Sequence, residues 1–131
     1  MEDKMTKLKN KKRKNKKCNL AFTSNGDGTC YVSGIGTCTE TDIIIPSKYR
    51  GESVTGIGEL AFYKRSDMKT VIIPEGVTDI GELAFYNCTG LTSITFNGTK
   101  AQWNAISKGS SWKGYVPATE VVCSDGSVSL G

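Results

Sequence analysis

The sequence has 131 residues, a formal net charge of +4 at pH 7 and no histidine, and this length fits a single domain. Without histidine the commonest general base is missing, and five cysteines with no C-x-x-C pair do not make a zinc-ligand pattern. We therefore expect no enzyme, no metal site and no cofactor. The longest apolar run, residues 43–45, is far too short to span a membrane.

The net positive charge of the chain comes from its N-terminal segment. Residues 4–17 read KMTKLKNKKRKNKK, with nine Lys or Arg and no acidic residue, whereas residues 18–131 hold eleven acidic and eight basic residues. Such a run repels itself, so we expect residues 1–17 to form a disordered basic tail. It would attract nucleic acid or an acidic surface in a salt-dependent way, although no aromatic residue is present to stack on bases.

No signal peptide is visible, because the chain becomes polar within a few residues of Lys17. The next segment, residues 18–38, is predicted to form an N-terminal cap. Within it, LAFTSNGDGTCYVSGI reads as two short strands around a Gly/Asn/Asp turn. Cys30 and Cys38 flank YVSGIGT and could face each other across this hairpin, either as a disulfide or as a reduced pair.

The central segment, residues 39–98, contains an internal repeat. VTGIGELAFY at 54–63 and VTDIGELAFY at 77–86 agree at nine of ten positions with an offset of 23, and strand-like DIIIP, TVIIP and SITFN stand at matching places. A fixed period of this length indicates a solenoid, in which stacked units share a core that one unit cannot bury alone. Each unit is expected to contain one short strand and, at ELAFY, a helical turn.

Strand alternation assigns a core and an exposed face to these units. Ile43, Ile45, Val71, Ile73, Ile94 and Phe96 should face inward. The expected structural core also contains Val54, Ile57, Phe62, Val77, Ile80, Phe85 and Leu91. The outward stripes, which form the candidate binding face, are Asp42/Thr70/Ser93, Ile44/Ile72/Thr95 and Pro46/Pro74/Asn97. Ile44 beside Ile72 is the informative pair, because solvent should favour polar residues there. The alternative is that β-branched residues simply suit a strand.

The last segment, residues 99–131, is predicted to be a C-terminal cap. KAQWNAIS places Trp103 and Ile106 on one side of a short amphipathic turn, and EVVCSDGSV reads as another hairpin. Residues 18–131 would thus form one domain.

GVTDIGELAFYNCTGLTSITF resembles the BspA-type leucine-rich repeat, which occurs in bacterial and protozoan surface proteins. One departure is Arg65, which stands where the second unit has Cys88. The resemblance implies a β-rich α+β solenoid, a short right-handed leucine-rich-repeat coil with hairpin-like ends. It also implies a cell-surface or secreted, non-catalytic module that recognises a partner protein, in adhesion or host binding, through the exposed sheet face. The alternative function is polyanion binding through the basic tail.

Overall fold

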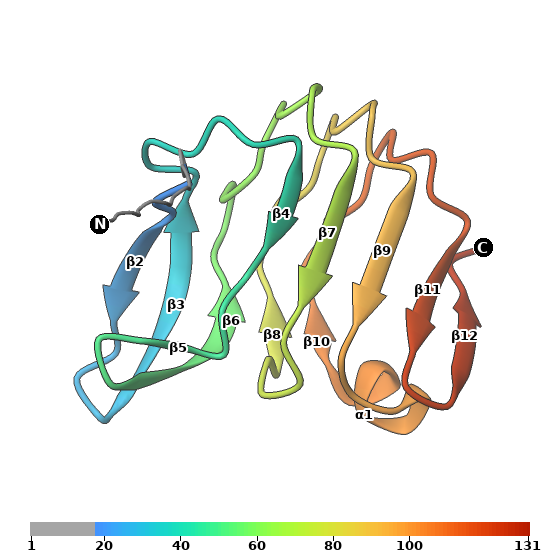
Figure 1. The fold of residues 1–131 in the computed structure, drawn as a ribbon. Helices are drawn as coiled ribbons and strands as arrows, with labels where there is room; N and C mark the ends of the chain where they lie inside the picture. The colour runs from blue at the N-terminus through green and yellow to red at the C-terminus, as the bar shows by residue number, and fades with distance from the viewer. Residues whose placement is uncertain (1–17) are drawn as a thin grey trace, which may run out of the picture.

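The computed structural model describes residues 18–131, which form a solenoid of two facing β-sheets (Figure 1). The predicted tail, residues 1–17, lies outside the described residues. One layer, here called the β6 sheet, contains β2 (Ala21–Ser24), β3 (Thr29–Gly34), β6 (Glu52–Ile57), β8 (Asp79–Ile80) and β10 (Ser107–Lys108), with β5 (Lys48–Tyr49) paired to β6. The other layer, the β7 sheet, contains β4 (Asp42–Ile44), β7 (Thr70–Ile73), β9 (Ser93–Phe96), β11 (Glu120–Cys123) and β12 (Gly126–Ser129).

The chain winds through the two sheets in four coils. Each coil places one strand in the β6 sheet and the next strand in the β7 sheet, so the coils are β3–β4, β6–β7, β8–β9 and β10–β11. Strands of successive coils are parallel, as a solenoid requires. The sequence predicts the β7-sheet strands and the β2–β3 hairpin. It does not predict the rest of the β6 sheet, because three of its strands, β5, β8 and β10, are only two residues long.

An antiparallel hairpin ends each sheet at opposite ends of the solenoid. β2 pairs with β3 at the N-terminal end of the β6 sheet, and β12 pairs with β11 at the C-terminal end of the β7 sheet. As a result β2 has no opposite strand in the β7 sheet, and β4 is an edge strand of that sheet.

The segments from the β6 sheet back to the β7 sheet form a third side made of turns, here called the turn layer (58–65, 81–88 and 109–115). Its backbone N–H groups alternate between bonds within a coil and bonds to the next coil. Ala61 donates to Gly58, whereas Phe62 donates to Ala84 of the next coil, and Phe85 donates in turn to Trp112. ELAFY therefore forms consecutive turns and not the expected helical turn, because half of its donors are committed to the neighbouring coil.

Glycine opens each segment of the turn layer because neighbouring backbones come very close there. A Cβ on Gly81 would lie 2.5 Å from the backbone N of Glu59, and one on Gly109 would lie 2.4 Å from the backbone N of Glu82. Both distances are shorter than real Cβ contacts, so only glycine fits. These glycines allow stacking and do not supply a positive φ.

The core between the sheets is continuous along the solenoid. All thirteen predicted core residues are buried, and Phe62 and Phe85 stack at 5.1 Å with nearly parallel rings. At the C-terminal end Trp103 packs against Phe96 at 5.6 Å and against Trp112 at 5.8 Å.

The helix α1 (Lys100–Ala105) presents Trp103 to this core, and its N-terminus is closed by a capping box between Thr99 and Gln102. It has six residues and is the one α-helix of residues 18–131. No helix in this range is long and apolar enough to cross a membrane.

The cysteine pairing differs from the prediction. Cys38 forms a disulfide with Cys18 and not with Cys30. Cys30 lies within β3 and points into the core, where its thiol contacts the carbonyl oxygen of Glu52 at 3.8 Å. The predicted Cys30–Cys38 pair is therefore wrong, because the strand buries Cys30 while Cys18 meets Cys38 outside the hairpin.

Candidate functional site on the outward face of the β7 sheet

The strand register brings the predicted face residues into rows across the β7 sheet. Ile44 is opposite Ile72, Ile72 is opposite Thr95, and Thr95 is opposite Val122 of β11. The row Ile44–Ile72–Thr95–Val122, here called the central stripe, therefore crosses four parallel strands.

Exposure varies along the central stripe. Ile44 is 67% exposed and Val122 is 45% exposed, whereas Ile72 and Thr95 are half-buried by their neighbours. Ile43 and Val71, next to them in the chain, are buried on the inner side, as the alternation predicts. The stripe is thus an apolar row on a solvent-facing sheet, with its most exposed residue at the β4 edge.

Polar residues line both sides of the central stripe. On one side Thr70 donates from its hydroxyl to Asp42 at 2.9 Å, and Ser93 is exposed beside them. On the other side Pro46 and Asn97 are exposed. An apolar centre with a polar rim is the usual composition of a protein interface.

Pro74 does not belong to this face, because it is buried. Its carbonyl accepts a hydrogen bond from the N–H of Val77, so Pro74 begins a turn and strand alternation no longer applies to it. Prediction of Pro74 as an exposed binding residue is therefore wrong.

Val122 is the residue of the stripe that the repeat pattern does not reveal. The fourth coil departs from the 23-residue period because α1 is inserted between β9 and β10. Only the run EVVC, with two β-branched residues in succession, signals a strand there.

A hollow opens beside β4, at the N-terminal end of the face. It has a volume of about 360 Å³ and is lined by Cys18, Asn19, Leu20, Phe22, Ile44, Pro46, Tyr49 and Arg50. The stretch between Pro46 and Val54 is longer than the matching stretch between Pro74 and Val77. It forms the hairpin β5–β6, which brings Tyr49 onto Phe22 with ring centroids 4.2 Å apart. A second hollow of about 240 Å³ shares Cys18 and Ile44 and is otherwise lined by Glu40 and Asp42.

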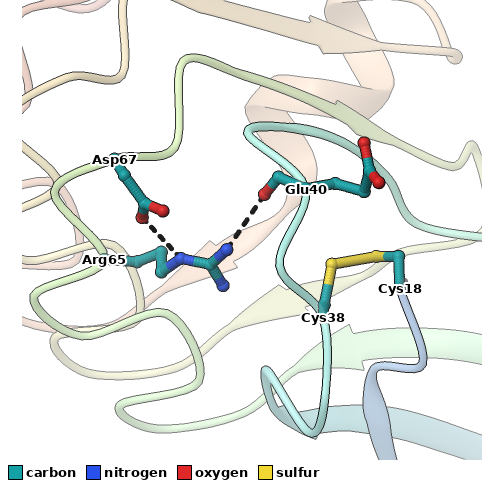
Figure 2. The surroundings of a disulfide bond; sticks show 5 residues. All are labelled: Cys18, Cys38, Glu40, Arg65 and Asp67. Atoms are coloured by element: carbon teal, nitrogen blue, oxygen red, sulfur yellow. Dashed lines mark hydrogen bonds and ion pairs between the residues drawn. A yellow bond between two sulfur atoms is a disulfide. The ribbon is translucent and has the colours of Figure 1, made fainter. Parts of the chain in front are cut away.

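Arg65 and the Cys18–Cys38 disulfide hold backbone segments that border these hollows, since Cys18 and Glu40 are among the lining residues. Figure 2 shows the contacts of both groups. The Arg65 guanidinium is 9% exposed, donates from Nε to Asp67 Oδ1 at 2.6 Å and from Nη2 to the carbonyl oxygen of Glu40 at 2.9 Å. This hydrogen bond from Arg65 lowers the pKa of the Asp67 carboxyl. The buried Nη1 finds no hydrogen-bond partner among residues 18–131. Arg65 thus ties the turn layer to the segment that enters β4.

A second exposed apolar area lies on the turn layer. Tyr63 and Tyr86 stack at 5.8 Å, Tyr115 meets Tyr86 at 5.5 Å, and Leu60 is 45% exposed nearby. This area is separate from the sheet face, because its residues lie in the turn layer and not in the strands of the β7 sheet.

Metal binding and thiol chemistry in residues 18–131 would depend on their acidic residues and cysteines. No cluster of Cys, Asp and Glu in that range could hold a metal ion. The free thiols of Cys30, Cys88 and Cys123 are buried, and burial raises the pKa of each of them, that of Cys88 to about 11. Such thiols are poor nucleophiles. The proposed alternative site, the basic segment 4–17, lies outside the described residues.

Comparison with protein families gives a match over more than half of the chain. The family described as BspA type leucine rich repeat region (6 copies) matches residues 36–111. This range covers the β7-sheet strands β4, β7 and β9 and most of the turn layer. No curated protein matches the sequence.

Solved structures of bacterial leucine-rich repeat proteins share the fold. A leucine rich cell surface protein of Faecalibacterium prausnitzii is 28% identical, with a TM-score of 0.59 over 78% of this chain and 30% of its own. A leucine-rich repeat protein of Bacteroides ovatus is 26% identical, with a TM-score of 0.59 over 79% of this chain and 27% of its own. The leucine rich repeat protein of T. pallidum, 22% identical with a TM-score of 0.55 over 60% of this chain and 40% of its own, shows the fold alone. This chain spans less than half the length of each of them.

Proposed function

The chain belongs to the BspA type leucine rich repeat family, and from that membership we propose that it is a non-catalytic module that binds a partner protein through the outward face of the β7 sheet. Repeat proteins of this kind often mediate protein–protein interaction. The observation that carries the proposal is the central stripe, in which Ile44 and Val122 remain 67% and 45% exposed at its two ends.

The stripe has the features of a small interface centre. Its four residues come from four hydrogen-bonded strands, so they are held on a rigid sheet and lose little conformational freedom on binding. Exposed isoleucine contributes little to the stability of the free protein but would be buried by a partner. Asp42, Thr70, Ser93 and Asn97 supply the polar rim.

We further propose that this recognition takes place outside the cytoplasm, in adhesion or host-protein binding at the cell surface. The Cys18–Cys38 disulfide supports this location, since such bonds persist in oxidising compartments. The Faecalibacterium prausnitzii protein that shares the fold is described as a cell surface protein.

The proposal is tested by placing a photo-reactive amino acid at Thr95 and identifying the protein that crosslinks to it. Binding of that purified protein is then measured with the Ile44→Thr/Ile72→Thr variant. We expect affinity to fall by more than about fivefold, which corresponds to about 1 kcal/mol, with the melting temperature nearly unchanged.

The matched control is Leu60→Asn/Tyr63→Thr, which removes two exposed apolar side chains from the turn layer and places at position 60, where φ is 62°, a residue that tolerates this conformation. This control should keep full affinity. Equal losses in both variants, or none in the Ile44/Ile72 variant, would remove the β7-sheet face as the binding site.

A further inference from the structure

The edge of the β7 sheet at β4 has room for one more strand. β4 pairs with β7 on one side only, and β2 of the opposite sheet extends one strand further than β4 does (Figure 1). A strand added beside β4 would therefore lie over β2, about 4.8 Å from β4.

The backbone of β4 is oriented to receive such a strand. The N–H of Ile45 donates to Ile72 in β7, and the carbonyl of Thr41 accepts from Lys69 and Thr70. Backbone groups of a strand point to alternate sides, so the N–H and C=O groups of Asp42 and Ile44 face the open edge. Open edges of this kind pair readily with extended chains.

Side chains around this position form two adjoining hollows that differ in polarity. The larger, of about 360 Å³, has Leu20, Phe22 and Tyr49 in its lining. The smaller, of about 240 Å³, has Glu40 and Asp42. Because both share Cys18 and Ile44, they follow the β4 edge from its acidic beginning to its apolar end.

We propose that this edge is an acceptor site for one extended strand of a partner polypeptide. The strand pairs in parallel with β4, inserts apolar side chains from two alternate positions into the larger hollow and places a lysine or arginine beside Glu40 and Asp42. Main-chain hydrogen bonds supply affinity and the two hollows supply specificity, as in other cases of strand addition. The site lies at the edge of the sheet face proposed above and shares with it Ile44, the end of the central stripe, and the flanking residues Asp42 and Pro46.

Two other occupants fit this site less well. A second copy would bring its own two layers to the edge, and β2 leaves space for a single strand only. The chain's own residues 1–17 contain two sizeable apolar residues, Met5 and Leu8, whose separation of three puts them on opposite faces of a strand. An external segment that supplies a single strand, with apolar residues at alternate positions, fits both the space over β2 and the larger hollow.

The solenoid repeat itself supplies a probe. β4 pairs with β7 in the same way as β7 pairs with β9. If the added strand pairs with β4 in this way too, the repeat sequence of β7 is a suitable occupant. The probe is a synthetic peptide of residues 69–75, Lys-Thr-Val-Ile-Ile-Pro-Glu, acetylated, amidated and labelled with a fluorophore. Its binding to the full chain is measured by fluorescence anisotropy, and saturable binding in the micromolar to millimolar range is expected.

Backbone methylation tests the pairing. In the proposed register the peptide N–H at Val71 points to β4 and that at Ile72 points away. N-methylation at Val71 should weaken binding by about tenfold, because a main-chain hydrogen bond is lost. The matched peptide methylated at Ile72 should bind within about twofold of the parent. Equal effects of the two methyl groups, or no saturable binding of the parent peptide, would overturn the proposal.

Protein variants separate this site from the sheet face. Glu40→Lys/Asp42→Lys should weaken the peptide by about threefold, as expected for exposed ion pairs. Glu120→Lys, an exposed acidic residue of the same sheet on β11, should have no effect. Ile72→Lys disrupts the central stripe and should leave peptide binding unchanged, so the two proposals can fail independently. A Glu120→Lys effect as large as that of the Glu40/Asp42 variant would show non-specific attraction and overturn the site.

The remaining occupants are tested with the full chain. Met5→Ser/Leu8→Ser should leave peptide affinity unchanged, whereas tighter binding would show that the chain's own N-terminal segment fills the edge. Sedimentation velocity should show the same species with and without peptide. A dimer that the peptide dissociates would assign the edge to a second copy. Either result would overturn the assignment to a partner.

Discussion

The N-terminal and C-terminal ends of the solenoid close the same two-sheet core with different interactions. At the C-terminal end, aromatic residues cover the core, with Trp103 packed between Phe96 and Trp112. At the N-terminal end, a disulfide and a buried guanidinium hold the backbone, and the edge of the β7 sheet stays open. Apolar packing covers the core at the C-terminal end, whereas covalent and polar contacts fix the backbone beside an open sheet edge at the N-terminal end.

The largest expected effect is at the C-terminal end. Trp103→Ala removes a side chain that is 2% exposed and should lower the free energy of unfolding by about 3–5 kcal/mol. Chemical denaturation measures this loss, and Phe62→Ala in the interior should lose a similar amount. A loss below about 1 kcal/mol for Trp103→Ala would mean that aromatic packing does not close this end.

At the N-terminal end the main effect should come from the disulfide. Cys18→Ser/Cys38→Ser removes a crosslink between residues 20 apart and should cost about 3 kcal/mol in the free energy of unfolding. Adding a reductant to the unmodified chain should reproduce this loss, and the variant should then be insensitive to reductant. A variant as stable as the oxidised parent would show that Arg65 and packing are sufficient at this end.

Arg65 of the β6–β7 coil and Cys88 of the β8–β9 coil occupy equivalent positions of the repeat. Cys88 donates its thiol to the carbonyl of Phe62 at 3.0 Å, and burial raises the thiol pKa from 9.0 to about 11. The folded chain thus keeps a proton that the unfolded chain releases, so this contribution to stability is complete below about pH 9 and disappears as the pH rises through about 11.

Denaturation midpoints at pH 8 and pH 10.5 test this linkage. The parent should lose more stability between the two pH values than Cys88→Ala does, while Cys18→Ser/Cys38→Ser should keep the slope of the parent. A slope unchanged in Cys88→Ala would show that other groups cause the alkaline loss.

The smallest expected effect concerns Lys108 on the β10 edge. In the strand register Lys108 takes the place of Ile80 and Ile57, and its Nζ donates to the carbonyls of Trp103 and Ile106 at 2.9 and 3.1 Å. Partial burial lowers the pKa of this amine. Lys108→Ile should change the free energy of unfolding by less than about 1 kcal/mol but promote association at the exposed edge. Light scattering across a concentration series measures this, with Lys108→Arg as the control, and a monomeric Lys108→Ile chain would show that the edge needs no charge.

Sequence reasoning was most successful where the repeat is most regular. Val71 and Ile73 align with Ile94 and Phe96 at the 23-residue period, so alternation alone assigns the inner and outer faces. Apart from the β2–β3 hairpin, the β6 sheet was not predicted, because a strand such as β8 has only two residues and forms its backbone pairs only when the coils stack. Pro74 and Val122 lie where a turn or an inserted helix interrupts the period. Cys18 could not be paired from sequence, because its approach to Cys38 depends on how the chain enters the first coil.

The two additions to the regular coil stand at the same corner, where the chain passes from the β7 sheet to the next strand of the β6 sheet. The β5 hairpin follows β4, and α1 follows β9, while the turn layer keeps its ladder of hydrogen bonds between coils. Between β7 and β8 this corner is a short turn with exposed Glu75 and Gly76. Foreign loops grafted between these two residues would emerge beside the sheet face without altering coil spacing, so the chain offers a natural attachment point for displaying peptides.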